Sequence, residues 1–154
     1  MPTAADGSVY GDNCKMYYSA TLGGAGALTE IPVVIDDSIA SERRTAESNC
    51  RGDAEIKTHV GKNKHTISGN LLMKRGTPGA TYLTLKTAFM ANTTLHWALA
   101  TGTITDIAEH VFRMEGRLAK FEETRADNDA VKVAFEIHPD PISTYASNWA
   151  VVPP

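Results

Sequence analysis

Residues 41–50 read Ser41-Glu-Arg-Arg-Thr-Ala-Glu-Ser-Asn-Cys50, a run with almost no apolar side chain. Its mixture of polar and β-branched residues allows an extended strand, in which alternate side chains lie on opposite faces. Ion pairs across such a ribbon contribute only ~0.2–1 kcal/mol each, and a two-stranded ribbon alone is marginally stable. We therefore expect a subunit whose neighbours complete its sheets.

On the C-terminal side of this strand, the sequence predicts two turns separated by a short alternating run. Arg51-Gly52-Asp53 is a turn sequence, because glycine adopts positive φ at little steric cost. Residues 54–60 alternate between apolar and polar side chains, and Gly61-Lys-Asn-Lys64 predicts the second turn. A further strand is expected over residues 65–73.

On the N-terminal side, the pattern predicts two short strands joined by a loop. The first strand begins at Cys14 and ends at Ser19, and the glycine-rich residues 22–27 that follow predict a flexible loop. Residues 31–35 predict the second strand, with Pro32 at a sheet edge or strand start. Residues 36–38, Asp-Asp-Ser, are expected to break it.

The C-terminal half predicts one helix and three strands. The helix is expected over residues 81–91, because apolar side chains recur there at helical spacing, namely Tyr82, Leu85, Ala88 and Phe89. Strands are expected over 95–99, 111–120 and 131–137. The clearest period-two signal is Val131, Val133, Phe135 and Ile137.

Composition indicates one globular domain. The 154 residues carry a formal net charge of −3, too small to indicate general attraction to nucleic acid or membrane. No apolar run approaches the ~20 residues of a membrane helix, and the start of the chain lacks the pattern of a secretion signal. Cys14 and Cys50 are expected to be reduced thiols, although a disulfide stays open.

The motifs of common catalytic and metal sites are absent from the sequence. The five histidines are scattered, and no phosphate-binding loop, calcium loop or Gly-x-Ser-x-Gly motif occurs. We expect no enzyme activity, no catalytic or metal-binding residues and no cofactor. One basic cluster could contact phosphate or form a solvated face; it consists of Lys62, Lys64, His65, Lys74 and Arg75.

The order of these elements, together with two sequence segments, resembles the tail tube proteins of long-tailed bacteriophages. The segments are Thr29-Glu-Ile-Pro32 and Lys120-Phe-Glu-Glu123 with Val131-Lys-Val-Ala-Phe-Glu136, and the likeness covers roughly residues 14–138. Tube subunits of contractile injection systems are similar. The resemblance implies a mainly β fold, a β-sandwich or half-barrel with one flanking helix. It also implies an N-terminal arm (1–13), a β domain (14–139) and a C-terminal extension (140–154).

The resemblance further implies a structural virion protein. Six copies would close a ring, rings would stack into the tail tube, and DNA would pass through it during ejection without tight binding. Expected partners are other copies, the tape measure and the tail terminator, with no membrane; assembly is expected in the host cytoplasm. The candidate inter-subunit or inter-ring loop contains Arg51, Asp53, Lys57, Lys62 and Lys64. The alternative is a stand-alone β-sandwich module that binds carbohydrate or protein.

Overall fold

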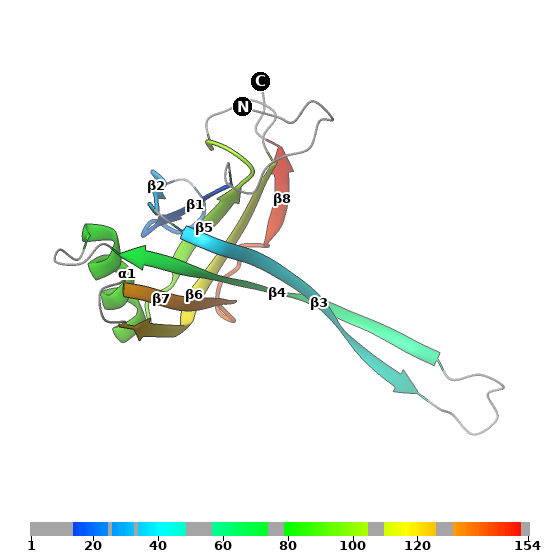
Figure 1. Ribbon diagram of the computed structural model, residues 1–154. Coiled ribbons are helices and arrows are strands. Elements are labelled where there is room, and N and C mark those ends of the chain that lie inside the picture. The colour runs from blue at the N-terminus through cyan, green and yellow to red at the C-terminus, as the bar shows by residue number, and fades with distance from the viewer. Residues whose placement is uncertain are drawn as a thin grey trace, which may run out of the picture.

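The computed structural model describes residues 14–24, 26–32, 34–48, 57–73, 79–104, 110–125 and 131–151. In this part of the chain, eight strands form one antiparallel sheet with a single helix beside it (Figure 1). The strand order is β2-β1-β5-β6-β7-β4-β3, and β8 also pairs with β6. The elements are β1 (Lys15–Ser19), β2 (Thr29–Glu30), β3 (Val34–Ser48), β4 (Lys57–Met73), α1 (Ala80–Met90), β5 (Leu95–Ala100), β6 (His110–Thr124), β7 (Val131–Pro139) and β8 (Asn148–Val151).

The long strand β6 connects the two halves of the sheet. One of its edges pairs with β5, and the other pairs first with β8 and then with β7. Gly116 lies where β5 and β7 flank β6 together, and a Cβ atom there would lie 2.4 Å from the carbonyl oxygen of His138. The Gly116 carbonyl also accepts a hydrogen bond from the Trp97 indole N–H, at 3.0 Å. This close packing requires glycine at position 116.

The main core lies between one face of the sheet and α1. The helix buries Tyr82, Leu85 and Ala88, and β7 contributes the buried side chains Val133, Phe135 and Ile137. Gly79, at the helix N-cap, makes no side-chain capping hydrogen bond, and the helix ends before Asn92, whose φ is 52°. Because burying one large apolar side chain contributes ~1.5–3 kcal/mol, packing rather than capping stabilises the helix.

The sheet bends strongly along its strand order. Although β3 and β5 are separated by three other strands, residues of both line the same pocket. A second, smaller apolar cluster lies on β1, β5 and β6; it consists of Tyr17, Ala98, Ala100 and Val111, covered by Leu28 and Ile104. Within the described ranges, no helix has the length and apolar character needed to cross a membrane.

The expected mainly β fold with one flanking helix is confirmed. The helix predicted over 81–91 is α1, and the alternating residues of 131–137 form β7 with three of its apolar side chains buried. The described residues of the glycine-rich stretch, 22–24, 26 and 27, form neither helix nor strand, as predicted, with positive φ at Gly23 and Gly24.

Three local predictions were wrong. Residues 61–64 form no turn, because they lie inside β4, where Asn63 is opposite Arg43 and Lys64 is opposite Glu42. Residues 36–38 do not end a strand: β3 continues through them with a register shift, and Asp36 takes a φ of 54°. Ile31 is buried but precedes β3, which begins at Val34. In the first two cases strand pairing overrides the local turn signal, and in the third the strand begins later than its apolar residues indicated.

Candidate assembly surfaces

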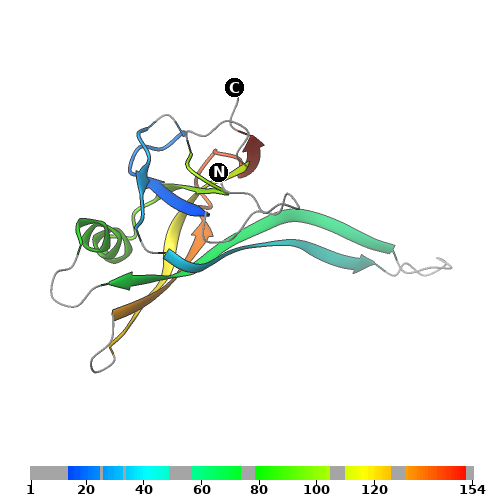
Figure 2. The ribbon, with the colours of Figure 1, turned by 45° about the horizontal axis from the view of Figure 1, so that its top comes forward.

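The most prominent surface feature is a two-stranded arm made by the outer parts of β3 and β4. Strand β7 pairs with β4 only over residues 67–73, so β4 has β3 as its sole described neighbour further out. We define the arm as residues 41–48 and 57–65. Figure 1 and Figure 2 both show it extending away from the other strands. Eight extended residues span about 26 Å, so the arm reaches far beyond the core.

Polar contacts hold the two strands of the arm together. Ser41 Oγ lies 2.8 Å from His65 Nδ1, and Arg43 donates from Nε to Asn63 Oδ1 at 2.7 Å. The side chains of residues 41–47 and 61–64 are exposed. At the base of the arm, His65 packs against Phe112 of β6, with ring centroids 5.2 Å apart. Further out the described side chains are exposed, and exposed polar pairs stabilise weakly, so the outer arm is the part of the molecule that most needs a neighbour.

A β-bulge in β4 interrupts the arm opposite Arg44. Arg43 pairs with Asn63 and Thr45 pairs with Val60, so two residues of β4, Gly61 and Lys62, face the single residue Arg44 of β3. A Cβ at Gly61 would lie 3.1 Å from the Arg44 carbonyl oxygen, so the close approach favours glycine there. Bulges change the direction of a strand and of its side chains, and this one lies where two arginines are adjacent.

The structure places only part of the candidate loop. Lys62 and Lys64 lie on β4 in the arm, exposed, and Lys57 begins β4 opposite Ser48. Arg51 and Asp53 lie outside the described residues. An inter-subunit role for these five residues stays a prediction.

Sequence reasoning left Arg43 and Arg44 out of the candidate loop, although they belong to the same arm. The alternating pattern of residues 41–50, which predicts a strand, was the sequence signal that could have added these two arginines to the candidate residues. By sequence the arm carries five basic and two acidic residues, a net charge of +3, whereas the whole chain carries −3. The arm is therefore a basic projection on an otherwise acidic protein.

The sheet face opposite the main core is polar where β4, β6 and β7 lie side by side. Lys120 Nζ lies 2.7 Å from Glu122 Oε2, and His138 Nε2 lies 2.5 Å from Glu136 Oε1. The hydrogen bond from His138 lowers the pKa of Glu136, and the charges of Lys120 and Lys64 lower it further. Cations and carboxylates alternate across this face, so their charges largely cancel.

A buried polar pair lies under the loops at the other end of the sheet. The carboxylate of Glu115 accepts hydrogen bonds from the Gly23 N–H at 2.5 Å and from the Ser143 hydroxyl. His96 is 1% exposed, its Nδ1 lies 3.9 Å from Glu115 Oε1, and burial lowers the pKa of its ring. Because Glu115 joins the glycine loop and residues 140–147 to β6, we assign this pair a structural role.

Neither the polar face nor the buried pair supplies a set of metal ligands. Among the described residues, no group of three or more histidine, cysteine, aspartate or glutamate side chains could hold a metal ion. The surfaces that stand out in the described part of the chain are the arm and the polar face.

The fold is shared with tail tube structures. The SPP1 tail tube superposes with a TM-score of 0.73 at 11% identity, covering 96% of this chain and 81% of that one. The tail of an empty gene transfer agent particle, refined with C6 symmetry, gives 0.69 at 11% identity, with 93% and 99% covered. The baseplate of the anti-feeding prophage, 6-fold symmetrised, gives a TM-score of 0.59 at 5% identity, covering 92% of this chain and 93% of that one.

No protein-family model and no curated protein sequence matches this chain. The chain therefore has the fold of phage tail tube proteins, which is related to that of contractile injection systems, as the sequence resemblance predicted.

Proposed function

We propose that this chain is a structural subunit of a tail tube. Six copies close a ring, and rings stack into a hollow tube that conducts DNA during ejection. The observation that carries this proposal is the exposed arm, a ribbon without a second layer of its own, on a fold shared with tail tubes. A stacked assembly gives each arm a neighbour, which explains why an otherwise marginal ribbon is maintained.

Six-fold closure is proposed from the symmetry of the similar structures. The gene transfer agent tail was refined with C6 symmetry, and the anti-feeding prophage baseplate was 6-fold symmetrised. Joining the sheets of six subunits would also cover strand edges that have no partner among the described strands, such as the outer edge of β3. A ring built this way would be held by backbone pairing as well as by side chains.

The polar face of β4, β6 and β7 suits the wall of the channel. Its paired charges, Lys120 with Glu122 and His138 with Glu136, leave few cations free to neutralise phosphates. Proteins that grip DNA release counterions from many phosphates at once, which makes their binding steeply salt-dependent. A wall of cancelled charge would let DNA slide past.

The remaining parts of the proposal concern the ends of the chain and of the tube. Residues 1–13 would act as an N-terminal arm, residues 14–139 as the body and residues 140–154 as an extension. Tape measure and tail terminator proteins would contact the tube, which would assemble in the host cytoplasm and become part of the virion tail. The role is non-enzymatic and needs no cofactor, and Arg51, Asp53, Lys57, Lys62 and Lys64 would lie at contacts between subunits or rings.

Assembly of the purified protein tests the proposal. We expect rings or tubes by negative-stain microscopy and a rise in sedimentation coefficient with concentration. A variant in which Asn-Gly replaces residues 43–63 should keep the body folded, because this dipeptide forms a tight hairpin turn, and should fail to form tubes. A compact monomer at every concentration, for the intact chain, would instead favour the stand-alone binding module.

A further inference from the structure

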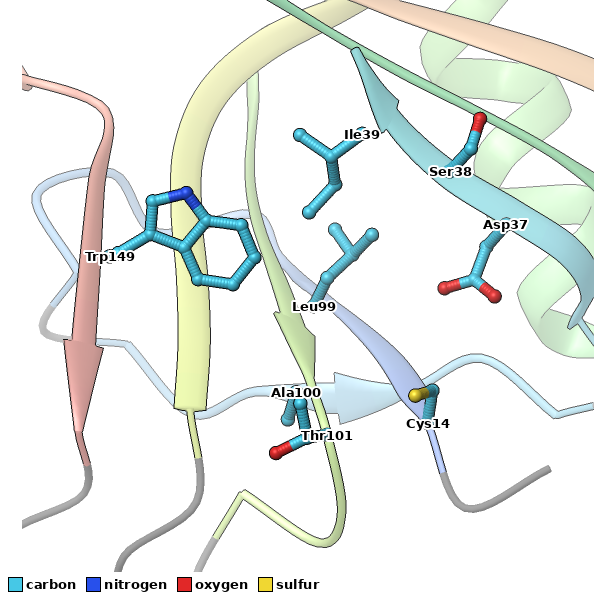
Figure 3. A pocket seen from close by; sticks show the side chains of 8 residues that line it. All are labelled: Cys14, Asp37, Ser38, Ile39, Leu99, Ala100, Thr101 and Trp149. Atoms are coloured by element: carbon cyan, nitrogen blue, oxygen red, sulfur yellow. The ribbon is translucent and has the colours of Figure 1, made fainter. Parts of the chain in front are cut away.

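A pocket of about 230 Å³ opens between the start of β3 and the ends of β5 and β8. Figure 3 shows Asp37 on one side of it and Trp149 on the other, with Ile39 and Leu99 between them. Trp149 is 58% exposed, a large fraction for a tryptophan, a residue type that is highly buried on average. Among the described residues, the Asp37 carboxylate has no ion-pair partner.

These walls have the composition that binds a long cationic side chain. An apolar floor covers the methylene stem of an arginine or lysine, a carboxylate pairs with the charged head, and an indole face attracts the cation. Arginine suits such a site better than lysine, because its planar head stacks on aromatic rings and pairs with a carboxylate through two N–H groups. The pocket therefore fits an arginine from a partner.

The arm offers such an arginine. Arg44 is exposed opposite the bulge, and its guanidinium has no hydrogen-bond or ion-pair partner in the described structure, whereas Arg43 is engaged by Asn63. Within one chain, Arg44 is separated from Ile39 of the pocket by five extended residues, about 16 Å along the same strand, and the strand leads away from the pocket. Arg44 could therefore fill this pocket only in a second copy.

We propose that the arm of one copy docks on the next copy, with Arg44 inserted between Asp37 and Trp149 of that copy. The inference rests on the proposed tube and names its contact. Charge complementarity supports it, because the arm has a net charge of +3 in a chain of net charge −3. The contact is heterologous, joining two different surfaces of identical subunits, so it can repeat along a stack of rings.

Charge-removing variants test the contact. Asp37→Asn and Arg44→Gln should each raise the threshold concentration for tube formation about five- to tenfold, since a desolvated cation–π and ion-pair contact is of that strength. The matched controls are Asp36→Asn, which changes the adjacent carboxylate outside the pocket, and Lys62→Gln, which removes another exposed cation of the arm. Asparagine also tolerates the positive φ of residue 36. The double variant Asp37→Arg with Arg44→Asp restores opposite charges and should recover part of the assembly.

Tryptophan fluorescence reports the docking directly. The chain has two tryptophans, and Trp97 is buried at 1% exposure, so acrylamide quenching of free subunits reports mainly Trp149. We expect tubes to protect Trp149 from quenching, and Trp149→Phe subunits to show no such change on assembly.

Two results would overturn the inference while leaving the proposed function intact. One is tubes in which acrylamide quenches Trp149 as strongly as in free subunits. The other is a threshold concentration for tube formation that rises equally in Asp37→Asn and Asp36→Asn, with no recovery of tube formation in the charge-swapped double variant. Failure of the intact chain to form rings or tubes at any concentration would overturn the proposed function, and the inference with it.

Discussion

Replacing Glu123 by glutamine should make the protein less stable at neutral pH but not in acid. Glu123 lies on β6 and joins the helix to the sheet. Its Oε1 accepts hydrogen bonds from the Tyr82 hydroxyl and from Lys86 Nζ, the latter at 2.8 Å, and its Oε2 accepts one from Arg125 at 2.8 Å. The bond from Lys86, followed by those from Tyr82 and Arg125, lowers the pKa of Glu123 to about 2.

The size of the effect follows from this pKa. A carboxyl whose pKa falls from 4.5 to about 2 on folding stabilises the folded state by roughly 3 kcal/mol when fully ionised, at ~1.4 kcal/mol per pKa unit. The side chains of Lys86 and Arg125 are 45% and 74% exposed, so solvent screens both partners. We therefore expect a loss of about 1–2 kcal/mol in the glutamine variant at pH 7.

Because folding lowers the pKa of Glu123, its contribution to the free energy of unfolding is favourable at neutral pH and decreases in acid. The stabilisation is fully present above pH 4.5, the ordinary pKa, and is lost as the pH falls towards 2, where the folded protein also binds the proton. Folding lowers the pKa of Glu122, Glu136 and Asp140 as well, so the intact protein loses stability in acid for several reasons. The contribution of Glu123 is therefore given by the difference in the free energy of unfolding between the intact protein and the Glu123→Gln variant.

Urea unfolding of the intact protein and the Glu123→Gln variant measures this difference at a series of pH values from 7 to 2. The protein concentration is kept low enough for both proteins to be monomeric. We expect the gap in the free energy of unfolding to be about 1–2 kcal/mol at pH 7 and to close in acid. A gap of the same size at both pH values would mean that the side chain acts through its shape rather than its charge. No gap at pH 7 would refute the reasoning altogether.

Three further predictions concern the core, the arm and the channel. Phe135→Ala should destabilise by ~3–5 kcal/mol in urea, because Phe135 is 4% exposed, whereas exposed Lys132→Ala should stay within ~0.5 kcal/mol; equal stabilities would mean that the faces of β7 are inverted. Residues 51–64 should gain hydrogen-exchange protection when the protein assembles, and equal protection in both states would argue against a contact there. Duplex DNA should bind the tube weakly, without the log–log salt slope of about −5 that six neutralised phosphates would produce; tight, steeply salt-dependent binding would indicate a nucleic-acid-binding role.

Local sequence pattern was enough to predict the elements that are defined by their own side chains. Alternation from Val131 to Ile137 predicts β7 and its buried face, and the spacing of Tyr82, Leu85 and Ala88 predicts α1, because each pattern repeats with the period of the backbone itself. The polar run 41–50 likewise indicates a strand that needs a neighbour. The mainly β fold could be predicted at this level.

The tertiary structure alone decided the register of the arm and the composition of the pocket. Turn residues at 61–64 became part of a strand because β3 pairs with Asn63 and Lys64 and resumes pairing at Val60 beyond the bulge, and pairing across strands cannot be read from the local pattern. Asp37 and Trp149 lie near opposite ends of the sequence, and they line one pocket because the sheet bends until β3 approaches β5 and β8. That bend depends on the packing and twist of strands distant in the sequence, so no single segment encodes it.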